Sequence, residues 1–113
     1  MSKTYIPKDL DDCFIELKKI LYPKCIEDIK NSRKGDIPSF HFGLGRYLRN
    51  KWKLWGESRL VDWFNTQGIK HPDDMSGIIL DSFWRNINSK PIELEEQIKF
   101  YQEYWKKQKD DKE

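Results

Sequence analysis

The sequence has no alanine, only two cysteines and no long apolar run. Without alanine, its helices have to pack through Ile, Leu and aromatic side chains. No stretch approaches the roughly 18 apolar residues of a membrane-spanning helix, and the N-terminus has no apolar signal core. We therefore expect a soluble, cytoplasmic protein with no export signal and no membrane contact.

The cysteines and histidines are too few and too scattered for a structural metal site. Cys13 and Cys25 are on segments that we expect to form separate helices, and the two histidines are His41 and His71. A zinc site needs about four ligands, and these four residues lack the spacing of a zinc finger. Thiols in a chain without an export signal stay reduced. The sequence thus predicts no disulfide, no metal and no cofactor.

The chain is nevertheless rich in side chains that build a core. Its 113 residues are 37% hydrophobic and 35% charged, and 14% are aromatic. Large rings bring much buriable area, and this length suits one domain. The sequence predicts a single globular domain with a strongly charged surface.

Apolar residues recur at helical spacing in six segments, and nowhere does a long alternation predict a strand. We expect helices to begin near Pro7 and Lys8, at Lys24, at Phe40, at Glu57 or Ser58, at Asp73 or Asp74 as caps, and at Pro91. The prediction is an all-α, compact, single-domain bundle of five to six short helices. Its parts are an N-terminal helical hairpin (1–31), a loop (32–39), a helical core (40–109) and a frayed tail (110–113).

Residues 41–105 resemble an uncharacterised bacterial domain family. The similarity rests on the blocks FGLGRYLRNKWKLW, HPDDMSGIIL and LEEQIKFYQEYW. The resemblance implies a small bacterial helical domain, and it constrains the first forty residues only loosely. It implies no reaction, because no catalytic residue comes with it.

The segment from His71 to Asp74 has the residue types of a catalytic site. An imidazole beside two carboxylates can act as a general base or bind a metal. The alternative, which we favour, is a helix start in which Asp73 and Asp74 cap free N–H groups and Pro72 sets the turn.

Other catalytic patterns are incomplete. Gly43-Leu44-Gly45 is similar to part of a phosphate-binding loop, but Leu48 replaces the third glycine and no strand precedes it. The two glycines are better explained by close helix packing. No Walker motif, GxSxG or HExxH occurs, and nothing places a cysteine in a positive, exposed setting. We expect no enzymatic activity.

Charge concentrates in the middle of the chain. Residues 31–60 carry seven basic and two acidic side chains, a net charge of +5, while the whole chain has +2. The helix expected there places Arg46, Arg49 and Lys53 on one face. Such a row can contact RNA phosphates or an acidic protein surface. Alternatively, Trp52 and Trp55 are core, and the cations are solvated or pair with the acidic last helix.

The last helix offers a second surface. Its aromatic residues cannot all face one narrow stripe, so we expect at least one exposed ring, with Tyr104 as the foremost candidate. The residues predicted to bind a partner or nucleic acid are Arg46, Arg49, Lys51, Lys53, Trp55 and Tyr104.

These observations predict a small, non-enzymatic binding protein that inhibits or modulates a larger protein or ribonucleoprotein. Examples are a phage-type inhibitor of a nucleic-acid-handling defence enzyme, such as an anti-CRISPR protein, and an immunity protein for a toxin. The alternative is an RNA-binding regulator that uses the segment from Arg46 to Trp55. A small hydrolase or nuclease centred on His71 and Asp74 is a third class. The oligomeric state stays open.

Overall fold

The computed structural model describes residues 5–32 and 41–111, which form helices and no strand. The elements in chain order are α1 (Leu10–Ile20), α2 (Pro23–Asn31), the π-helical turn η2 (His41–Gly45), α4 (Arg46–Lys51), α5 (Arg59–Thr66), α6 (Pro72–Ile87) and α7 (Leu94–Asp111). The prediction of a compact all-α single domain is confirmed. Nearly all of the predicted loop at 32–39 lies outside the described residues. Among the helices described, none combines the length and apolarity that crossing a membrane requires.

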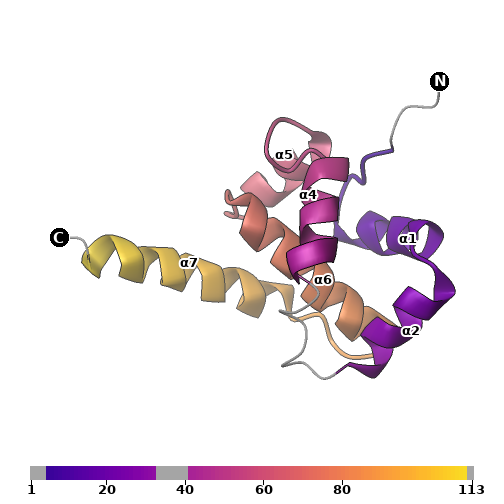
Figure 1. The fold of residues 1–113 in the computed structure, drawn as a ribbon. Coiled ribbons are helices and arrows are strands. Elements are labelled where there is room, and N and C mark those ends of the chain that lie inside the picture. Colours follow the sequence, from indigo (N-terminus) through magenta and orange to yellow (C-terminus); the bar gives the residue numbers. More distant parts are fainter. Residues whose placement is uncertain (1–4, 33–40, 112–113) are drawn as a thin grey trace.

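Helix α6 is the centre of the fold, and η2, α4, α1, α2 and α7 all pack against it (Figure 1). Ten of its sixteen residues are buried, so it contacts neighbours on almost every side. Five of its residues that recur at helical spacing are all buried: Met75, Ile78, Ile79, Ser82 and Phe83. The largest fully buried side chain is Trp52, which follows α4.

Helix α5 begins at Arg59 with Ser58 as its N-cap, next to the start expected at Glu57 or Ser58. The Ser58 hydroxyl caps the helix by accepting a hydrogen bond from the Val61 N–H at 3.3 Å. Leu60 and Phe64 are fully buried. Gly68 has a φ of +86°, the left-handed conformation that glycine adopts without a steric penalty.

Three predicted helix starts are wrong by two or three residues. Helix α1 begins at Leu10, because the Asp9 side chain caps it by accepting from the Asp12 N–H. Helix α6 begins at Pro72 with His71 as its N-cap, so neither aspartate that follows is the cap. Helix α7 begins at Leu94 because Glu93 has a φ of +52°.

Helix α7 is only partly integrated into the core and extends away from the other helices (Figure 1). Along its apolar stripe, Ile98 and Tyr101 are half-buried, and Trp105 is 40% exposed. The residue it buries most is Gln97. The helix continues to Asp111, so part of the tail expected to fray is helical.

A polar cluster around Asp12 ties the segment before α1 to the domain. The Tyr5 hydroxyl donates to Asp12 Oδ2 at 2.6 Å, and the Lys8 N–H donates to the same oxygen at 3.1 Å. Burial alone would raise the pKa of Asp12, but these two hydrogen bonds and the positive charge of Arg59 outweigh it and lower the pKa below the usual 3.8.

Removing the Tyr5 hydroxyl will therefore weaken the fold in a pH-dependent way. A depressed carboxyl pKa stabilises the native state above the unfolded-state pKa, and that stabilisation is lost as pH falls through the native pKa. Tyr5→Phe should lower the Tm near neutral pH, and the deficit should shrink below about pH 4. Thermal melts followed by circular dichroism at several pH values test this, with Tyr22→Phe as the control. A deficit of equal size at every pH would contradict the role of Asp12.

Candidate functional site

The basic segment of the sequence folds into α4 and the turn that follows it. Within α4, Leu48 is buried. Trp52 is the C-cap of the helix, and its indole is fully buried. The chain then reverses at Lys53, which has a φ of +54°, and Leu54 returns to the core at 2% exposure. Because Leu54 points into the core, the next side chain, Trp55, points outward and is 63% exposed.

Five basic or aromatic side chains of this segment reach the solvent, and we call them together the basic-aromatic surface: Arg46, Tyr47, Lys51, Lys53 and Trp55. Lys51 is half-buried and the other four are exposed. The Lys51 ammonium lies 5.7 Å from the centre of the Tyr47 ring. Within the described residues, no ion pair involves its three cations, so the surface keeps a charge of about +3.

The position of Arg49 differs from the one that we predicted from the sequence. Its side chain is only 13% exposed, whereas we expected it to be free on the outer face. Nη1 donates to Ser76 Oγ at 2.8 Å, and Nε lies 3.4 Å from Asp73 Oδ1 as an ion pair without an aligned hydrogen bond. The predicted row of three cations is also broken at Lys53, because α4 ends at Lys51.

Arg49 instead contacts both Asp73 of α6 and the exposed ring of Trp55. Its guanidinium carbon lies 5.9 Å from the centre of the Trp55 ring, within cation–π range. The partner that neutralises it is Asp73 of α6, not a glutamate of the last helix. Of the two tryptophans that we considered as core, Trp52 is buried and Trp55 is exposed.

The acidic side chains in the first turn of α6 do not converge on one catalytic point. Asp73 faces Arg49, whereas the Asp74 carboxylate, 8% exposed, accepts a hydrogen bond from Trp105 Nε1 at 2.7 Å. The His71 ring stacks on Trp105, with centroids 3.9 Å apart and an interplanar angle of 18°. In the part of the chain that the structure describes, no three His, Cys, Asp or Glu side chains cluster as metal ligands do.

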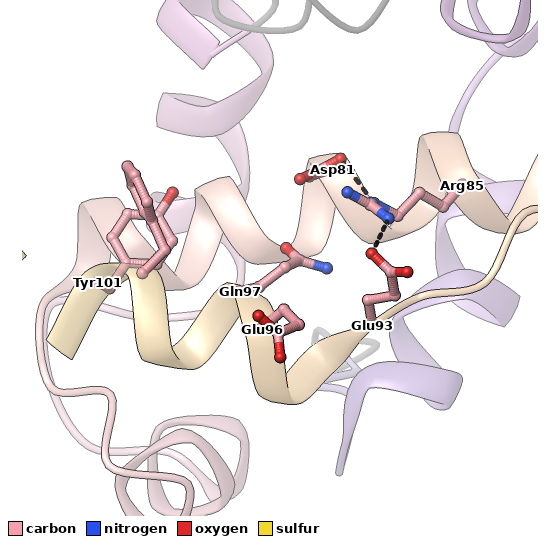
Figure 2. A pocket seen from close by; sticks show the side chains of 7 residues that line it. Asp81, Arg85, Glu93, Glu96, Gln97 and Tyr101 are labelled. Atoms are coloured by element: carbon pink, nitrogen blue, oxygen red, sulfur yellow. Dashed lines mark hydrogen bonds and ion pairs between the residues drawn. The ribbon is translucent and has the colours of Figure 1, made fainter. Parts of the chain in front are cut away.

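A pocket of about 340 Å³ opens between α6 and α7 (Figure 2). Arg85 spans one side of it, with Nε 3.2 Å from Asp81 Oδ1 and Nη1 3.2 Å from Glu93 Oε2. Burial, and then the carboxylates of Asp74 and Asp81, raise the pKa of Tyr101 to about 12, so its hydroxyl stays protonated at neutral pH. The pocket is lined by Asp81, Arg85, Glu93, Glu96, Gln97, Phe100 and Tyr101.

The two thiols are also held in their protonated form. Cys13 is buried and Cys25 half-buried, and both are free. Burial first, and then nearby aspartates, raise the pKa of each thiol, that of Cys13 strongly. A nucleophilic cysteine needs the opposite shift.

Sequence reasoning missed several residues. Tyr47 is not among the predicted binding residues, but it is 47% exposed. On α7, Tyr104 is 47% exposed and Phe100 is 63% exposed, so Phe100 is the more accessible ring. Phe100 lies four residues after Glu96, and this helical spacing was the sequence signal that placed it on the outer face of the helix.

Gly43 was expected at a close helix contact, but a Cβ there would meet nothing within 4 Å.

The fold and this surface define a small all-α domain with an exposed basic-aromatic face. Residues 6–87 match the family described as "Domain of unknown function (DUF6794)". Because the match spans more than half of the chain, the protein belongs to this family. The match includes α1 and α2 and ends before α7, so the block LEEQIKFYQEYW lies outside it. No curated protein and no solved structure matches the chain.

Proposed function

We propose that the protein is a non-enzymatic binding module that modulates a larger protein by docking its basic-aromatic surface on an acidic face of that partner. The observation that carries the proposal is Trp55, a 63% exposed indole two residues after Lys53, an exposed cation that makes no ion pair within the described residues. Tryptophan, tyrosine and arginine are the residues in which binding energy most often concentrates. The buried Trp52 and Leu54 fix the turn that presents the indole.

An acidic protein is favoured over RNA by the position of Arg49. Electrostatic RNA affinity grows with the number of phosphates contacted, and Arg49 is already paired with Asp73. Three cations and two exposed rings suit a compact protein contact, in which charge guides the approach and the rings supply affinity. In this proposal the protein is cytoplasmic and of bacterial or phage origin, acting as an inhibitor of a nucleic-acid-handling enzyme or as an immunity protein.

Affinity capture from the native cell, with and without nuclease, tests this proposal. The wild type should recover an acidic protein at stoichiometric ratio after nuclease treatment. Trp55→Ala should weaken the binding of that protein by about 30-fold or more, and Lys53→Glu should weaken it mainly at low salt. Tyr22→Ala is the matched control, because Tyr22 is 82% exposed but belongs to the junction of α1 and α2. Recovery that disappears with nuclease would instead indicate RNA binding. Equal loss in Trp55→Ala and Tyr22→Ala would contradict the proposed surface.

A further inference from the structure

Helix α7 has one face held by the domain and one face directed to solvent. On the inner face, Gln97 Nε2 donates a hydrogen bond to Ser82 Oγ at 3.0 Å, and Trp105 Nε1 donates one to Asp74 Oδ2. The outer face consists of Glu96, Phe100, Glu103, Tyr104 and Lys107, all of which are exposed. Glu96 and Lys107 are eleven residues apart, about three helical turns, so they share this face. Neither forms an ion pair within the described residues.

The charged residues of this face are acidic at its start and basic at its end. Glu96 and Glu103 are the acidic members, and Lys107 is the basic member. An antiparallel copy of the same helix would reverse this order and bring opposite charges together at both ends. Antiparallel helices also bring their macrodipoles into a favourable arrangement.

From this self-complementary pattern we infer that α7 pairs in antiparallel orientation with α7 of a second copy, making the protein a two-fold symmetric homodimer. With Glu96 opposite Lys107 of the second copy, symmetry repeats the same pair at the other end. This register places Phe100 beside Glu103 and Tyr104 of the second copy. The most exposed ring of α7 is then covered at the centre of the interface, where burial contributes most.

The surroundings of α7 favour a second copy of the chain as the partner of its outer face. The helix extends away from the other elements, so a second copy can lie alongside its outer face (Figure 1). Glu96 and Phe100 also border the pocket between α6 and α7, whose lining has three carboxylates and only one cation (Figure 2). Lys107 of the second copy would approach this acidic rim.

The expected dimer is weak. Helix α7 has 18 residues and is about 27 Å long, so the contact is at the small end of specific interfaces. We expect a dissociation constant of the order of micromolar. This inference does not depend on the proposed function, because the basic-aromatic surface belongs to a different helix and loop.

Sedimentation equilibrium of the full chain, across a concentration series spanning about 1 to 500 μM, tests the inference by charge reversal. Glu96→Lys alone and Lys107→Glu alone should each weaken the dimer by roughly tenfold, since each places like charges opposite one another twice. The double variant Glu96→Lys with Lys107→Glu should restore the wild-type dissociation constant. Phe100→Ala should leave a monomer over most of the range, and circular dichroism should show each variant folded.

Two results would overturn the inference. One is a wild-type chain that stays monomeric throughout the series. The other is a dimer whose dissociation constant does not respond to the single charge reversals, because such a dimer uses another surface. Tyr22→Ala is the control for nonspecific aromatic association and should leave the dissociation constant unchanged.

Discussion

Trp52→Ala should lower the free energy of unfolding by about 3–5 kcal/mol, the range for removing a large buried aromatic side chain. Trp52 is fully buried, and its backbone ends α4. The loss combines the transfer free energy of the indole with a cavity that the neighbouring helices cannot fully close. Urea unfolding followed by far-ultraviolet circular dichroism measures the change without depending on tryptophan fluorescence.

Trp55→Ala is the matched control, three residues away and of identical chemistry. Because Trp55 is 63% exposed, its replacement should change the free energy of unfolding by less than about 1 kcal/mol. Similar costs for the two variants would mean that both indoles belong to the core, and the basic-aromatic surface would lose its central ring.

Arg49→Ala should cost about 1.5–3 kcal/mol of stability, the range for hydrogen bonds to charged groups. The substitution removes the bond to Ser76 and the ion pair with Asp73, which together join α4 to α6. It also removes the guanidinium beside Trp55, so the fluorescence emission of the folded protein should change.

Arg46→Ala is the comparison for this prediction, because Arg46 is exposed one turn earlier and makes no ion pair within the described residues. Its cost should stay within about 0.5 kcal/mol. Urea unfolding of both variants, measured in parallel, decides the point. Equal costs would show that Arg49 is a surface cation after all.

The parts of the fold that the sequence predicted well have local causes. The hydroxyl of Ser58 at the start of α5 and the helical spacing of residues from Met75 to Phe83 in α6 each act within a few residues of chain. Such signals are sufficient to locate helices and their inner faces. Helix starts were less accurate where an unusual backbone conformation intervenes, as at Glu93.

The candidate site depends on contacts between distant residues, which the helical spacing of apolar residues in the sequence does not predict. Arg49 and Asp73 are 24 positions apart, and only the packing of α4 on α6 brings them together. Trp55 follows the left-handed turn at Lys53, which a helical pattern cannot anticipate because lysine rarely adopts that conformation. Gln97 is buried because Ser82 and the Ile92 carbonyl accept its amide hydrogens.

Hydrogen exchange of the protein, free and in complex with its captured partner, is the most direct test of the central claim that the basic-aromatic surface is the docking face. Amides of residues 46–56 should exchange more slowly in the complex, while those of residues 15–22 should be unchanged. Protection confined to other elements, with residues 46–56 exchanging as in the free protein, would contradict the claim.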